Sequence, residues 1–132
     1  MPDIVDEAVD YLVKGEYETA FHMLCQTAND SMQPPGLRAD AFQLLGTLVQ
    51  MAPEFAAGDE SGLSHYQKAI QLVPDHLWAA VGVVSGFRDS PPGHQDKTAF
   101  LAADSIIRAQ WEQLDDAARN QVEQHRRIFE SM

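Results

Sequence analysis

Apolar residues recur three or four positions apart along almost the whole chain, which is the spacing of one face of an α-helix. Turn-forming clusters interrupt the pattern at residues 29–36 ("NDSMQPPG"), 51–62 ("MAPEFAAGDESG") and 88–96 ("RDSPPGHQD"). No stretch alternates apolar and polar residues over the length of a strand, apart from the short and ambiguous "VGVV". The spacing therefore predicts an all-α protein of seven helices, built either as an antiparallel bundle or as a stack of helical hairpins.

The stretch "HYQKAIQLVPDHLWAA" favours the stack of hairpins. Tyr66, Ala69 and Pro74 precede Trp78 in an order that resembles the end of one tetratricopeptide repeat and the start of the next. That repeat is a helix–turn–helix unit of about 34 residues with the pattern W-x2-L-G-x2-Y…A-x3-F…P. Internal repeats of this kind distinguish a helical array from a simple bundle.

Two units of the repeat can be aligned in the first half of the chain. Residues 1–34 resemble the family at Ala8, at Tyr11 and in the turn "KGEYETA". Residues 35–74 contain "FQLLG", in which Phe42 stands in the tryptophan position, and they end at the family's proline. The turn between the two helices of this second unit is longer than in the family.

The third unit, residues 75–113, is degenerate. It begins with Trp78 and Gly82 at the family spacing, but it carries an insertion and has Leu114 where the final proline belongs. Residues 114–132 resemble the polar capping helix that such an array needs. The resemblance implies a single domain, residues 1–132, of three stacked hairpins in a right-handed superhelix with a C-terminal capping helix.

Small residues recur at equivalent positions of the three units, namely Ala8, Gly46 and Gly82. Glycine inside a helix costs up to about 1 kcal/mol relative to alanine. Close approach of neighbouring helices would offset this cost, so we expect tight helix packing there. We also expect Trp78 and Trp111 to be core aromatics.

The chain is acidic, with 20 Asp and Glu against 9 Lys and Arg and a net charge of -11. Residues 1–34 alone contain seven acidic residues and one lysine. Such a surface repels nucleic acids and anionic membranes, and it attracts basic partners. Solvated helix faces and an acidic docking patch both explain this charge.

Sequence signals for catalysis, cofactors and metals are absent. The five histidines lack zinc-binding spacing, the single Cys25 has no assignable base, and no phosphate-binding loop or hydrolase motif occurs. We therefore predict a protein that is not an enzyme and binds no cofactor or metal. One cysteine, no secretory signal and no apolar run long enough to span a bilayer predict a cytoplasmic protein.

The groove of tetratricopeptide repeats is lined mainly by the first helix of each hairpin. The resemblance implies that eight residues of this chain contact a partner there: Val5, Val9, Leu12, Gln43, Thr47, Gln50, Ala79 and Val83. Chaperone-binding members use Lys and Asn to clamp a peptide's terminal carboxylate, whereas Val5 and Val9 occupy the first-repeat clamp positions here. We therefore expect no carboxylate clamp and a basic or amphipathic partner segment instead. The alternative is that both valines pack inside.

Three classes of function are compatible with these patterns. The favoured one is a protein-binding module that acts as an adaptor or small chaperone. The second is an acidic neutralising protein, of the immunity-protein or antitoxin type, that covers a basic effector. The third is an enzyme subunit or a catalyst without a recognisable motif.

Overall fold

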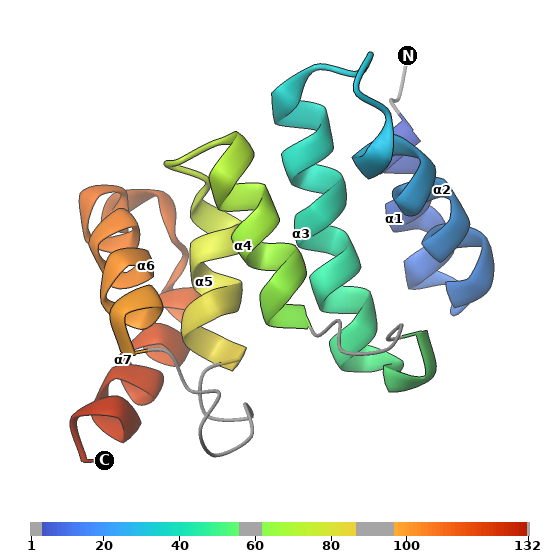
Figure 1. Ribbon diagram of the computed structural model, residues 1–132. Helices are drawn as coiled ribbons and strands as arrows, with labels where there is room; N and C mark the ends of the chain where they lie inside the picture. Colours follow the sequence, from blue (N-terminus) through green and yellow to red (C-terminus); the bar gives the residue numbers. More distant parts are fainter. Residues whose placement is uncertain (1–3, 56–61, 87–96, 132) are drawn as a thin grey trace.

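The computed structural model describes residues 4–55, 62–86 and 97–131 (Figure 1). These ranges contain seven α-helices and no strand, which confirms the all-α prediction. The predicted turns at 51–62 and 88–96 lie largely outside the described residues. None of the described helices is long and apolar enough to cross a lipid bilayer. The elements are α1 (Ile4–Val13), α2 (Tyr17–Asn29), α3 (Pro35–Met51), η1 (Pro53–Phe55), α4 (Gly62–Leu72), α5 (Leu77–Gly86), α6 (Lys97–Ala109), η2 (Trp111–Gln113) and α7 (Asp116–Glu130), where η denotes a 3-10 turn.

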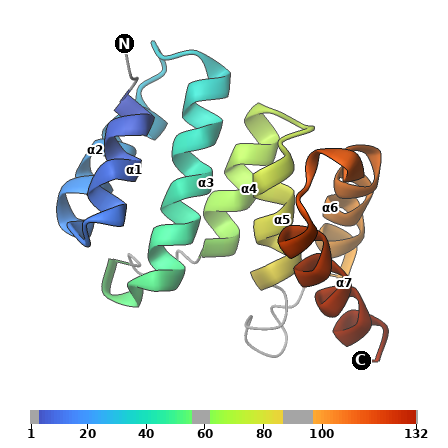
Figure 2. The same cartoon turned by 180° about the vertical axis from the view of Figure 1, so that it is seen from behind.

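The helices lie in two layers. Figure 1 shows α2, α4 and α6 on the near side, and the view from behind in Figure 2 brings α1, α5 and α7 forward. Each helix from α1 to α5 packs on the helix that follows it. In addition, α1 contacts α3, α3 contacts α5, and α5 contacts α7, so the odd-numbered helices form one row of neighbours.

Local sequence explains where several helices begin and end. Gly15 has a φ of 80°, in the left-handed region that favours glycine, and it turns the chain between α1 and α2 as the sequence predicts. Helix α3 begins at Pro35, whose fixed φ suits the first turn of a helix. Asp115 caps α7, because its carboxylate accepts the backbone N–H of Ala118 at 2.8 Å.

A core runs between the two layers. Gly82 of α5 lies so close to α4 that a Cβ added there would come within 2.5 Å of the Tyr66 ring. This contact confirms the tight packing expected at Gly82. Ala8 is fully buried as well. The largest fully buried side chains belong to helices from both layers: Leu24, Leu45, Leu48, Val84, Phe100, Ile107 and Val122.

Helix α7 is attached to the preceding helices by apolar and charged contacts. Val122 is buried, and the ring of Phe129 stacks on Phe100 of α6 with their centroids 4.1 Å apart. Arg126 donates from Nε to Oδ1 of Asp104, a buried carboxylate on α6, at 2.5 Å. These contacts join the C-terminal helix to the layer formed by α6.

The expectation that both tryptophans are core residues is wrong for Trp78, which is 49% exposed. In the first turn of α5, Leu77 and Ala79 are buried and take the inward positions, so Trp78 faces solvent. Trp111 is half-buried in η2, beyond the end of α6. The guanidinium of Arg126 lies 4.8 Å from the Trp111 ring, a cation–π arrangement.

Candidate partner-binding surface

A row of polar side chains runs along one face of α3. Asp40, Gln43, Thr47 and Gln50 follow one another at intervals of three and four residues, so they project from the same side of the helix. Gln43 donates from Nε2 to Oγ1 of Thr47 at 3.2 Å, which ties adjacent turns together. The last three members are predicted groove residues. These four residues are called the α3 row below.

Tyr66 of α4 joins the α3 row through its hydroxyl group. That oxygen lies 3.1 Å from Oγ1 of Thr47 and donates to Oε1 of Gln50 at 3.2 Å. Burial of the side chain raises the pKa of the phenol, an effect that the hydrogen bond with Thr47 opposes. Because the ring also packs on Gly82, three helices meet at this one side chain.

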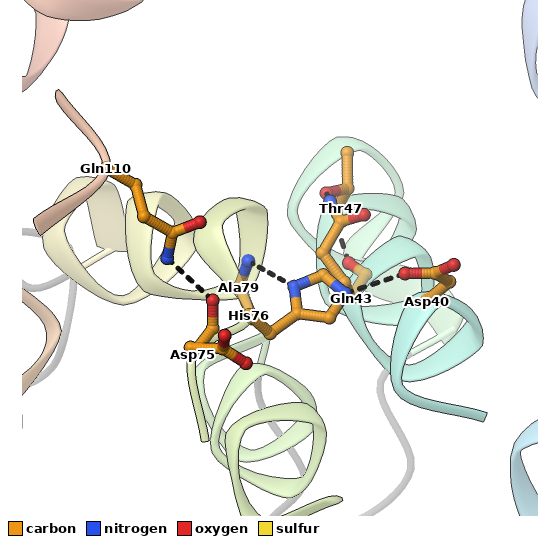
Figure 3. Close-up of polar contacts among 7 residues, drawn as sticks. All are labelled: Asp40, Gln43, Thr47, Asp75, His76, Ala79 and Gln110. Atoms are coloured by element: carbon orange, nitrogen blue, oxygen red, sulfur yellow. Dashed lines mark hydrogen bonds and ion pairs between the residues drawn. The ribbon is translucent and has the colours of Figure 1, made fainter. Parts of the chain in front are cut away.

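His76 anchors the joint between α4 and α5 to α3 (Figure 3). Its Nε2 lies 2.7 Å from Oδ1 of Asp40, and its Nδ1 accepts the backbone N–H of Ala79 at 3.1 Å. Because Nδ1 accepts a hydrogen bond, Nε2 carries the proton that is donated to Asp40. His76 thereby satisfies a free N–H of the first turn of α5, a role more often filled by Asn, Asp or Ser. Gln110 holds the same joint by donating to the carbonyl of Asp75 at 2.8 Å.

Helix α1 presents an apolar ridge beside acidic side chains. Val9 is 36% exposed, and Val13, four residues later on the same face, is 82% exposed. Asp6, Glu7 and Asp10 are exposed at neighbouring positions. The sequence identified Val9 but not Val13, although its spacing from Val9 was a signal that could have included it. These two residues are called the Val9–Val13 ridge below.

Other predicted groove residues are less accessible. Val5 is 9% exposed and Leu12 is half-buried, so only Val9 of the two clamp-position valines reaches the surface. Ala79 and Val83 of α5 are buried in the core. The structure therefore brings Gln43, Thr47 and Gln50 together on α3, whereas the two α5 residues are buried.

Charge is distributed unevenly over the described residues. Residues 4–55 contain eight acidic and two basic residues, whereas residues 97–131 contain six acidic and five basic residues. Both basic side chains of the first range already have contacts within the protein. The Lys14 ammonium lies 5.7 Å from the ring centroid of Tyr11, and Arg38 donates from Nε to the carbonyl of Ala28. Residues 4–55 therefore carry six more acidic than basic side chains.

A hollow of about 390 Å³ lies in the same acidic half. Glu16 and Glu18 from the start of α2 and Glu54 from η1 line it, together with the aromatic rings of Tyr17 and Phe55. Lys and Arg side chains combine a charged end with an aliphatic stem, which suits such a mixed lining. The hollow thus adds acidic side chains near the start of α2 and in η1 to those exposed on α1.

The described residues contain no group of three or more His, Cys, Asp or Glu side chains that could hold a metal ion. Cys25 is half-buried, and as the single cysteine of the chain it forms no disulfide within it. The buried carboxylate of Asp104 is paired with Arg108 and Arg126. The described surface can therefore recognise a partner through the hydrogen-bonding groups of the α3 row, the Val9–Val13 ridge and the acidic side chains.

Sequence reasoning did not assign Asp40, His76 or the Tyr66 hydroxyl to the candidate surface. Asp40 lies three residues before Gln43, so helical periodicity carried a signal for it. The contact between His76 and Asp40 spans 36 residues of chain and left no local signal. The resemblance assigned Tyr66 only to the aromatic position of the repeat pattern, and the hydrogen bonds of its hydroxyl group were not anticipated.

Comparisons with protein-family models, curated proteins and solved structures find no match. The function proposed below is therefore derived from the residues of this chain.

Proposed function

We propose that this protein is a non-enzymatic, tetratricopeptide-repeat-like binding module that acts as an adaptor or small chaperone in the cytoplasm. In this proposal α1–α2, α3–α4 and α5–α6 are the three hairpins, and α7 is the cap. The row of contacts from α1 through α3 and α5 to α7 supports such a stack. The partner is a basic, amphipathic protein segment that lies across α1 and α3.

The observation that carries the proposal is the exposed Val9–Val13 ridge beside Asp6, Glu7 and Asp10. Two exposed apolar side chains one helical turn apart can pack against the apolar face of an amphipathic helix of the partner. The neighbouring carboxylates can pair with Lys or Arg residues that flank this apolar face. Their negative charge would also accelerate association with the basic partner. A lone solvated acidic face would not require exposed valines at this spacing.

The α3 row supplies the polar part of the surface. Gln50 and Asp40 are exposed, and Gln43 and Thr47 are half-buried. The hydrogen bonds of Thr47 and Gln50 with Tyr66 hold their side chains in place before a partner arrives. Such pre-organisation lowers the entropy lost on binding.

The proposal is tested with a synthetic amphipathic peptide that carries leucines one turn apart and flanking lysines. Isothermal titration should detect binding that weakens as salt rises, because screening reduces the attraction between exposed charges. A peptide with glutamates in place of the lysines should not bind. Val9→Glu should weaken binding by about tenfold or more, since it removes apolar contact and introduces a charge.

Leu101→Glu provides the matched control, because Leu101 is also an exposed apolar residue but lies on α6. Circular dichroism should show that both variants fold, and only Val9→Glu should lose the peptide. Equal binding of the lysine and glutamate peptides, or unchanged binding by Val9→Glu, would contradict the proposal.

The acidic neutralising protein is the second candidate function. The hollow lined by Glu16, Glu18 and Glu54 favours it, because this feature spreads the acidic surface beyond the helix face that a single peptide would cover. A neutralising protein should bind a folded basic protein tightly and a short basic helix poorly. Titration of both kinds of partner under the same salt conditions separates the two functions.

A further inference from the structure

A groove lies in the layer opposite the proposed partner-binding surface, between α4 and α6, with α5 beneath it. It has a volume of about 360 Å³. Val83 of α5 and Ala103 of α6 are buried and form its floor, while the half-buried Ile70 and Ile106 line it from α4 and α6. Figure 1 shows α4 and α6 on the same side of the molecule. The groove is thus built on three helices.

Small side chains on α6 create much of the open space. Ala99 and Ala102 line the groove one turn apart, and Ala102 is exposed to solvent. On the facing helix, Gln67 and Gln71 line the groove four residues apart. Their side-chain amides can each donate and accept hydrogen bonds, so the groove combines an apolar interior with two neutral polar groups.

The described residues that line the groove are all uncharged, in a chain with a net charge of -11. An anionic ligand would lose its hydration there without meeting a cation, and the acidic protein would also repel it. A cationic ligand would meet no carboxylate among these residues. The described lining therefore suits a neutral ligand better than a charged one.

The volume of the groove further limits which ligands it can bind. Small-molecule pockets are typically roughly 300–1,000 Å³, apolar in the main, with a few polar groups that orient the ligand. This groove lies near the lower end of that range and has that composition. We propose that it binds a small, uncharged, mainly aliphatic molecule whose hydroxyl, carbonyl or amide group hydrogen-bonds to Gln67 or Gln71. This site is independent of the peptide-binding function proposed above.

The test compares two probes of equal chain length, 1-octanol and octanoate, added to isotopically labelled protein and followed by NMR. Octanol should shift the amide resonances of α4 and α6 residues that line the groove. Octanoate should bind about tenfold more weakly, because its carboxylate has no cationic partner there. Ala102→Phe, which fills the groove from its exposed side, should abolish the octanol shifts.

Ser105→Phe is the matched control, because Ser105 is an exposed α6 residue that does not line the groove. It should leave octanol binding unchanged. If Ala102→Phe lowers the melting temperature, Ala102→Leu blocks the same space with a smaller side chain. The proposal is overturned if octanol causes no shifts, shifts residues of α1 and α3 instead, binds no better than octanoate, or still binds after the groove is filled.

Discussion

The ring of Tyr66 lies directly against Gly82, and its hydroxyl group reaches Thr47 and Gln50 on α3. One side chain therefore connects α3, α4 and α5. Any side chain at position 82 would have to displace this ring. The ring is buried and hydrogen-bonded at its far end, which limits how far it can move.

Gly82→Ala should destabilise the protein by about 1–3 kcal/mol, the usual cost of overpacking a core. The added Cβ would come within 2.5 Å of the Tyr66 ring. Gly36→Ala is the control, because a Cβ there meets nothing within 4 Å and the change should be neutral or stabilising by up to about 1 kcal/mol. Urea denaturation measures both free energies of unfolding. Equal stability of the two variants would contradict the tight contact.

Tyr66→Phe should cost about 0.5–1.5 kcal/mol at neutral pH, because it removes the hydrogen bonds to Thr47 and Gln50. Burial raises the pKa of Tyr66, so the folded protein retains this proton to higher pH than the unfolded chain. The resulting stabilisation is fully present below the ordinary tyrosine pKa of about 10 and is lost as pH rises through the raised value.

Two measurements check this pH dependence. Ultraviolet absorbance should show a tyrosinate transition of the folded protein that occurs above the ordinary range and is missing from Tyr66→Phe. Denaturation at increasing pH should show the wild type losing its advantage over Tyr66→Phe. If the wild type stays more stable than Tyr66→Phe once every tyrosine is ionised, the protonated Tyr66 hydroxyl is not the source of the extra stability.

Helical periodicity predicted the all-α fold, and the resemblance to tetratricopeptide repeats predicted the turn at Gly15 and the close packing at Gly82. Neither the periodicity nor the resemblance predicted which side of α5 faces solvent, because Trp78 is exposed and Val83 is buried. This helix is apolar on all sides, "LWAAVGVV", so its sequence contains no polar face to mark the side that meets solvent. Which apolar residues are covered depends on the neighbouring helices, and periodicity within one helix carries no information about them.

The candidate surface was predictable to the extent that it follows a single helix. Gln43, Thr47 and Gln50 share one face of α3 by spacing alone. Their connection to Tyr66, and that of Asp40 to His76, depends on contacts between segments far apart in the chain. Only the packing of α3 against its neighbours brings these groups together.

His76→Ala should destabilise the protein by about 1–2 kcal/mol, because it removes both the cap of α5 and the contact with Asp40. His76→Asn should recover most of this loss, since a shorter amide can still accept the Ala79 N–H. Asp40→Ala should cost less than about 1 kcal/mol, because the Asp40 side chain is 55% exposed. Thermal unfolding of the three variants checks this order, and a larger effect of Asp40→Ala would show that capping is not the main role of His76.

The two arginines that contact Asp104 should differ sharply in their importance. Arg126 donates to Oδ1 with a side chain only 16% exposed, whereas Arg108 donates to Oδ2 and is 66% exposed. Arg126→Ala should cost about 3–5 kcal/mol, because it removes a buried partner of a buried carboxylate and uncovers Trp111. Arg108→Ala should cost much less, because solvent already screens its charge. Hydrogen exchange of α7 amides should accelerate in Arg126→Ala while those of α1 stay protected, and equal exchange in both variants would show that this ion pair does not hold α7 in place.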